Sequence, residues 1–92
     1  MTAIWKYPLT NDSLQNVAMP RGAKIVACMM QGKTLALWAM VDPSAVLETH
    51  IISICGTGHE FEVDDIGEYV GTFQDGWYVG HVFDWRASGE KR

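Results

Sequence analysis

The sequence is poor in charge and has no long hydrophobic run. Only 20% of its 92 residues are charged, whereas 48% are hydrophobic and 11% aromatic. A disordered chain carries more charge and fewer aromatics, so this composition excludes disorder. The longest apolar run, Leu35–Val41, has seven residues, and a membrane-spanning helix needs about 20. We therefore expect one soluble globular domain with no membrane contact.

Clustered basic charge is also missing. Seven basic residues face 11 acidic ones for a net charge of −4, and the basic residues are dispersed along the chain. Binding to a nucleic-acid polymer rests largely on the neutralisation of phosphates, so this class of partner is disfavoured. The carboxylates are equally dispersed, which disfavours an acidic mimic of DNA.

Cysteine is scarce, and the N-terminus has no basic segment followed by a long apolar one, as a signal peptide would. The two cysteines, Cys28 and Cys55, are therefore expected to be reduced thiols rather than a disulfide. A cytoplasmic location follows as the prediction.

Hydrophobic spacing favours strands almost everywhere, with turn signals about every ten residues. This pattern predicts an all-β domain over residues 1–86, a small antiparallel barrel or sandwich of about seven strands, followed by a frayed polar tail at 87–92. Asp42-Pro43 could open one short helical turn, and Asp75-Gly76 predicts a tight hairpin loop. The expected strands are Ala3–Tyr7, Ser13–Met19, Lys24–Gln31, Thr34–Val41, His50–Cys55, Tyr69–Phe73 and Trp77–Trp85.

The two central strands, 24–31 and 34–41, are apolar on both faces. In the first, strict alternation puts Ile25, Ala27 and Met29 on one face. A chain of this size buries only about two-thirds of its unfolded surface, so it covers two apolar faces from within only with difficulty. We therefore predict a homo-oligomer, and the five methionines suit an adaptable interface.

The segment Gly56-Thr57-Gly58-His59 is the first candidate site. Glycines let backbone N–H groups approach an anion closely, as in phosphate-binding nests. No Gly-Lys-Ser/Thr follows, so the phosphate-loop pattern is incomplete, and a plain tight turn is the simpler interpretation. If the loop binds a small anionic or nucleotide ligand, Trp38 is the aromatic that we expect to stack on a base.

Metal binding and catalysis have weaker support. His50, His59 and His81 are possible metal ligands. A structural zinc site needs four ligands, however, and the sequence has no second pair of ligands at the usual short spacing. We therefore predict neither a metal nor another cofactor. His59 precedes several carboxylates, so a general base is conceivable. No nucleophile motif is present, however, and no catalytic residue is assigned. His81 lies on a face of Trp, Val and Phe, where a hydrogen-bonded core residue is the usual outcome.

The aromatic residues form the last candidate. Four Trp and three Tyr exceed what so small a core needs, and both types are enriched where proteins bind partners. On the last strand, Trp77, Tyr78 and His81 are the residues we expect at an interface.

Several ordered motifs resemble a family of small proteins classed as a domain of unknown function and encoded mainly by bacteriophages and prophage-bearing bacteria. These motifs are Ile4–Pro8, Met19–Ile25, Leu37–Pro43, Gly56–His59, Tyr69–Gln74 and His81–Phe83. The resemblance implies a phage-type accessory protein in the cytoplasm of a bacterial host. It implies no activity and no catalytic residue.

The resulting hypothesis is a non-enzymatic, homo-oligomeric binding protein, such as a counter-defence factor. It would bind a host protein or a small anionic ligand. The alternatives are a small metal-dependent enzyme using His59 and His81, and a structural or assembly component of the virion.

Overall fold

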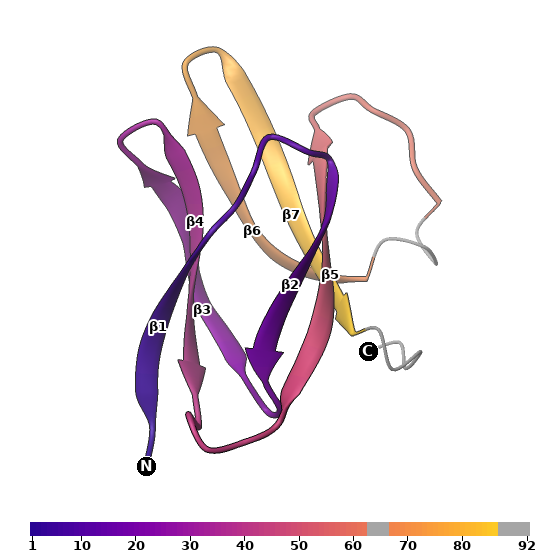
Figure 1. Ribbon diagram of the computed structural model, residues 1–92. Helices are drawn as coiled ribbons and strands as arrows, with labels where there is room; N and C mark the ends of the chain where they lie inside the picture. The colour runs from indigo at the N-terminus through magenta and orange to yellow at the C-terminus, as the bar shows by residue number, and fades with distance from the viewer. Residues whose placement is uncertain (63–66, 87–92) are drawn as a thin grey trace.

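The computed structural model describes residues 1–62 and 67–86 and confirms the all-β prediction (Figure 1). In those residues there are seven strands and no helix. The predicted tail at 87–92 lies outside the described residues. No helix in the described part is long and apolar enough to cross a membrane. The strands are β1 (Ala3–Pro8), β2 (Leu14–Pro20), β3 (Lys24–Gln31), β4 (Thr34–Val41), β5 (Leu47–Gly56), β6 (Glu68–Asp75) and β7 (Tyr78–Arg86).

The strands form two antiparallel sheets that face one another as a sandwich (Figure 1). Sheet A has the order β1-β4-β3, and sheet B has the order β2-β5-β7-β6. Every pairing within both sheets is antiparallel. β3 and β6 contact each other at one side of the sandwich. Sheet A thus has three strands and sheet B has four.

The core lies between the sheets and centres on β4. Because side chains alternate along a strand, Leu37, Ala39 and Val41 of β4 all point inward, and they are fully or almost fully buried. They belong to one cluster with Ile52 and Val82 from the opposite sheet. β4 thus alternates regularly along its length.

β3 departs from its predicted alternation because it contains a β-bulge. Its pairing with β4 shifts between Ile25 and Ala27, so Val26 is the extra residue and is 47% exposed. Ile25 then lies on the inward face, whereas Ala27 and Met29 lie on the outward face. The prediction that these three share a face was wrong, because a bulge inserts one residue and reverses the alternation.

Two predicted turns also differ in detail. The helical turn expected after Asp42 is absent. The Asp42 carboxylate accepts hydrogen bonds from the N–H and hydroxyl of Ser44 at 3.0 and 2.7 Å, and its carbonyl accepts from the N–H of Ala45 at 3.0 Å, so the chain makes one hydrogen-bonded turn before β5 begins at Leu47. In the β6–β7 hairpin, Asp75 pairs with Tyr78. The loop is therefore Gly76-Trp77, one residue later than predicted, with the positive φ of 62° at Gly76.

The outward face of sheet A exposes several apolar side chains and carries two lysines, since Lys24 pairs with Met40 and Lys6 pairs with Trp38 and hydrogen-bonds Gln31 across β4. Met40, Ile4 and Met29 are 37%, 62% and 50% exposed, and the half-buried Trp38 lies between β1 and β3 on the same face. The two-sided apolar character of these strands is therefore present in the fold.

Gly80 shows how tightly sheet B packs. A Cβ added there would lie 2.5 Å from the ring of Phe73, which pairs with Gly80 across β6 and β7. We predict that Gly80→Ala lowers the free energy of unfolding by about 1–3 kcal/mol, the usual effect of overpacking a core. Urea denaturation measures this loss. In a Phe73→Leu background the loss should shrink, and an equal loss in both backgrounds would contradict this explanation.

Candidate ligand-binding site

The glycine loop after β5 and the β6–β7 hairpin form one hollow at the end of the sandwich. It has a volume of about 500 Å³, within the range of small-molecule sites. Its lining joins residues predicted separately as ligand-binding and as interface. The lining residues are Gly56, Thr57, His59, Trp77, Tyr78 and Val79.

Gly56 is required for close packing rather than for its φ angle. A Cβ at Gly56 would lie 3.1 Å from the ring and hydroxyl of Tyr78 and 3.2 Å from the imidazole of His59. The missing Cβ lets both side chains approach the end of β5. Gly58 has a different role, since its φ of +91° is a left-handed conformation that glycine adopts without strain.

The loop backbone does not offer a row of amides to an anion. The N–H of Thr57 donates to the carbonyl of Val79 at 3.1 Å, and the N–H of His59 donates to the carbonyl of Gly56 at 3.1 Å. A phosphate nest needs successive N–H groups that point at the ligand. Two of the loop amides are thus already used, and polar recognition here depends on side chains.

A chain of hydrogen bonds on the outer face of sheet B fixes the loop. The Thr57 hydroxyl contacts both the carbonyl of Val79, at 3.4 Å, and Nε2 of His81, at 2.7 Å. Nδ1 of His81 lies 3.0 Å from the hydroxyl of Thr72, which is 2.6 Å from that of Tyr69. Because a hydroxyl can both donate and accept, Thr57 and Thr72 give each ring nitrogen of His81 a partner in either tautomer. His81 is therefore a positioning residue with both nitrogens occupied.

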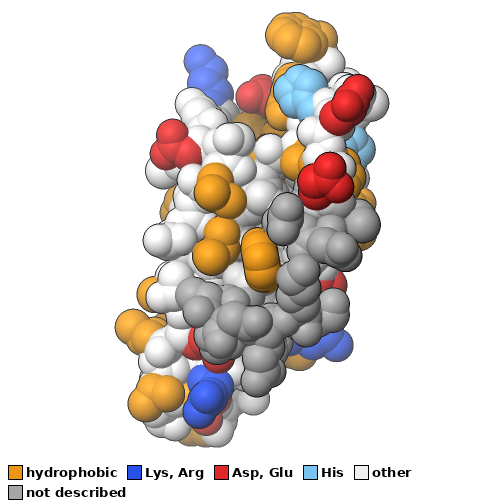
Figure 2. All heavy atoms as spheres, turned by 90° about the vertical axis from the view of Figure 1, so that its right-hand side faces the viewer, with side chains coloured by type: hydrophobic (Ala, Val, Ile, Leu, Met, Phe, Trp, Pro, Cys, Tyr) orange, Lys and Arg blue, Asp and Glu red, His pale blue; other side chains and the backbone are white. Residues whose placement is uncertain are grey.

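Aromatic side chains form the wall of the hollow. Trp77 is 89% exposed at the hairpin tip, and its ring meets that of Tyr78 edge to face, with centroids 6.1 Å apart. Tyr78 also packs against Phe73, with centroids 6.0 Å apart. On the side of the molecule shown in Figure 2, histidine side chains lie at the upper end beside carboxylates and hydrophobic groups.

Trp38 is not part of this site. It lies on β4 in sheet A, on the outward face, where the Lys6 ammonium is 6.0 Å from its ring centroid. The structure therefore does not bring Trp38 to the glycine loop, and the prediction that it stacks on a ligand there has no geometric support.

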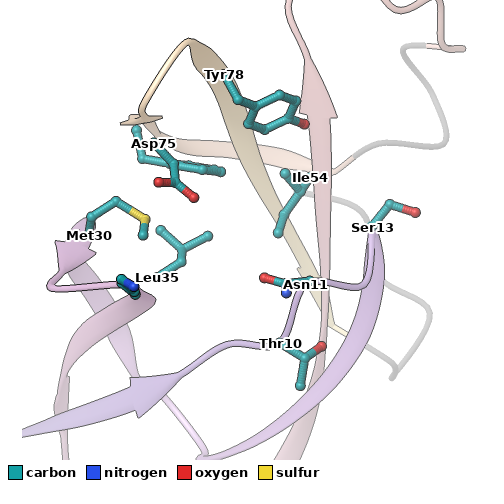
Figure 3. A pocket seen from close by; sticks show the side chains of 10 residues that line it. Thr10, Asn11, Ser13, Met30, Leu35, Ile54, Asp75 and Tyr78 are labelled. Carbon is teal, nitrogen blue, oxygen red and sulfur yellow. The ribbon is translucent and has the colours of Figure 1, made fainter.

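Sequence reasoning missed a second cavity, which opens between the two sheets at the same end (Figure 3). It has a volume of about 230 Å³. Tyr78 borders both this cavity and the hollow at the glycine loop. The residues around it come from five strands and two connections, so no local sequence pattern indicated it. Its lining consists of Thr10, Asn11, Ser13, Met30, Lys33, Leu35, Ile54, Phe73, Asp75 and Tyr78.

The third histidine, His50, lies in the core and not at the hollow. It is 1% exposed, and its Nδ1 is 2.9 Å from a carboxylate oxygen of Asp84, which is 5% exposed. Its Nε2 faces Glu48 at 3.8 Å. This burial makes His50 a structural partner of Asp84, out of reach of a substrate. Among the described residues, no three His, Cys, Asp or Glu side chains are grouped so that they could hold a metal ion.

Neither cysteine is arranged as an activated nucleophile. Both are free thiols, and burial raises the pKa of Cys28 to about 11. Cys55 pairs with His81 across β5 and β7, but both ring nitrogens of His81 already contact hydroxyl groups. A reactive cysteine needs a depressed pKa or a nearby base.

The chain belongs to the family described as a domain of unknown function, DUF7352, whose model matches residues 1–92. This match confirms the resemblance at the level of such a family. The phage origin stays a prediction. No curated protein and no solved structure matches the chain.

The burial of Cys28 predicts a dependence of stability on pH. Its pKa is raised from 9.0 to about 11 in the folded state, so folding favours the protonated thiol. The stabilisation is complete below pH 9 and is lost as the pH rises toward 11. Denaturation at a series of pH values should show this decline in the wild type and a weaker one in Cys28→Ala. Identical profiles would contradict the assignment.

Proposed function

We propose that this member of the DUF7352 family is a non-enzymatic binding protein that holds a planar heteroaromatic ligand, such as a nucleoside or nucleotide, in the hollow at the glycine loop. The observation that carries the proposal is the exposed indole of Trp77 beside Tyr78 at a hollow of ligand size. The exposed indole offers a flat face to a ligand, and aromatic side chains stack on bases of any sequence.

The polar groups of the hollow support recognition of the ring rather than of a phosphate. His59 supplies an imidazole, which can exchange hydrogen bonds with the edge of a base, whereas the Thr57 hydroxyl is already held by the carbonyl of Val79 and by His81. The amides of Thr57 and His59 already donate to the carbonyls of Val79 and Gly56. Because Glu60 follows His59 and is exposed, the local charge also gives little help to an anion. A phosphate should therefore add little affinity.

We propose that the protein is not an enzyme because the side chains that could act as a base or a nucleophile are buried or already hydrogen-bonded. His81 is hydrogen-bonded at both nitrogens, His50 is buried against Asp84, and the pKa of Cys28 is raised by burial. None of these groups is positioned to take a proton from a substrate in the hollow.

Self-association through the outward face of sheet A is a second proposal. Ile4, Met29, Met40 and the ring of Trp38 lie on this face beside Lys6 and Lys24, and exposed apolar side chains with a polar rim mark an interaction surface. We propose a second copy of the chain as the partner, since methionine side chains adapt to a self-complementary contact.

The biological role remains the one that the family resemblance implies. A phage-type accessory protein in the cytoplasm of a bacterial host would use such a site to sequester a metabolite or to inhibit a host protein. A component of the virion and a metal-dependent enzyme using His59 and His81 are the alternatives.

Removal of the Trp77 ring tests the hollow. We expect Trp77→Ala to weaken binding of adenosine or guanosine by about tenfold or more, since stacking contributes about 1–3 kcal/mol per base. Calorimetry with nucleosides and their monophosphates measures this effect, and each pair should bind with similar affinity. Trp38→Ala is the matched control and should bind as the wild type does. No heat with any ligand of the panel would overturn the proposal.

A charge on the outward face of sheet A tests self-association. We expect the wild type to be an oligomer in native mass spectrometry and Met29→Glu to be a monomer, because the new carboxylate would lose its hydration in the contact. Leu14→Glu is the control. Leu14 is also exposed, at 64%, but it lies on sheet B. A monomeric wild type would contradict the proposal.

A further inference from the structure

The cavity between the sheets has an apolar floor. Leu35 and Phe73 are buried there, and Met30 and Ile54 complete the floor beside the Tyr78 ring. Figure 3 shows the side chains of Met30, Leu35 and Ile54 directed into the same space. Four different strands, β3 to β6, each supply one of the side chains of Met30, Leu35, Ile54 and Phe73. The floor is therefore part of the sandwich itself.

The rim of the cavity is polar and preorganised. The β1–β2 loop carries Thr10 and Asn11 at the rim. Gln15 holds this loop, because its side-chain oxygen accepts from the N–H of Thr10 at 2.9 Å and its amide donates to the carbonyl of Asp12 at 2.9 Å. The N–H of Ile54 donates to the carbonyl of Ser13 at 2.8 Å, which ties the loop to β5. A rim fixed in advance has little entropy to lose on binding.

Two opposite charges border the same cavity. Lys33 comes from the β3–β4 turn and Asp75 from the β6–β7 hairpin. Within the described part of the chain, neither forms an ion pair with the other or with another residue. The carboxylate of Asp75 points toward the interior of the cavity in Figure 3. The rim thus presents one cation and one anion above an apolar floor.

We propose that this cavity binds a small zwitterion with an apolar side group, of the chemical class of a free aliphatic α-amino acid. The carboxylate of the ligand pairs with Lys33, its ammonium group pairs with Asp75, and its side group lies against Leu35 and Ile54. The volume of about 230 Å³ equals that of about eight water molecules at about 30 Å³ each. Free aliphatic amino acids such as valine and leucine are small enough for this space.

The methionines provide a direct readout. In protein labelled with 13C at the methionine methyl groups, Met30 reports on the cavity floor. Met29 and Met40 report on the outward face of sheet A, and Met19 reports on the core. We expect L-leucine to shift the Met30 signal in a saturable titration and to leave the Met19 signal in place. A Met30 signal that stays in place at the highest soluble leucine concentration would overturn the proposal.

Analogues that lack one charge test the zwitterion. Isopentylamine has no carboxylate and 4-methylpentanoate has no ammonium group, so each should bind about tenfold or more weakly than leucine, as expected for loss of a hydrogen bond to a charged group. Equal affinity for all three ligands would show binding to the apolar floor alone and would overturn the assignment of the charges.

Two exposed variants connect each ligand charge to one residue. Lys33→Gln should weaken leucine about tenfold and leave isopentylamine unchanged, and Asp75→Asn should do the same for leucine while leaving 4-methylpentanoate unchanged. Lys24→Gln is the matched control, since Lys24 does not line this cavity. Loss of leucine binding in that control would contradict the proposal.

This cavity is independent of the hollow at the glycine loop in one testable respect. Trp77 lines the hollow but not the cavity. Trp77→Ala should therefore keep the leucine-induced shift of Met30 even where nucleoside binding is lost. A failure of one proposal is thus distinguishable from a failure of the other.

Discussion

The structure depends on the packing of one apolar layer between two sheets of unequal size. The inward row of β4, with Leu37 and Val41, meets Ile52 and Val82 from sheet B, and this contact fixes which face of every strand is buried. Each side chain of β4 that does not enter this layer must point to the outside. Because the described chain has no third layer, the apolar outward face of sheet A is a direct consequence of how the core is made.

The same constraint explains why both candidate sites lie at one end of the sandwich. Two twisted sheets that meet through a central core separate toward their ends, and at one end the glycine loop, the β1–β2 loop and two hairpin turns surround the gap (Figure 1). Tyr78 stands where β7 begins, between the two spaces. Its ring separates the hollow, with its aromatic wall, from the cavity, with its charged rim, so the two sites differ in chemistry although they share a residue.

Much of the fold was predictable because the strands obey local rules. Alternation and turn residues located all seven strands, and Gly32 and Gly76 adopt the positive φ that tight hairpin loops need. The errors were also local in cause. A bulge at Val26 reverses the alternation of β3, and a single hydrogen-bonded turn from Asp42 to Ala45 takes the place of the expected helical turn. Neither event leaves a clear mark on hydrophobic spacing, since the bulged residue is as apolar as its neighbours.

The candidate site was likewise predictable from the sequence only in part. The sequence by itself determined the strands, the two-sided apolar character of β3 and β4, and the glycine loop with its histidine, because these follow from residue type and spacing along the chain. Only the tertiary structure decided that Trp77 and Tyr78 meet this loop, that Trp38 does not, and that Lys33 and Asp75 border one cavity. The physical reason is that side chains meet across sheets according to strand order, and strand order is set by which apolar faces pack together in the core.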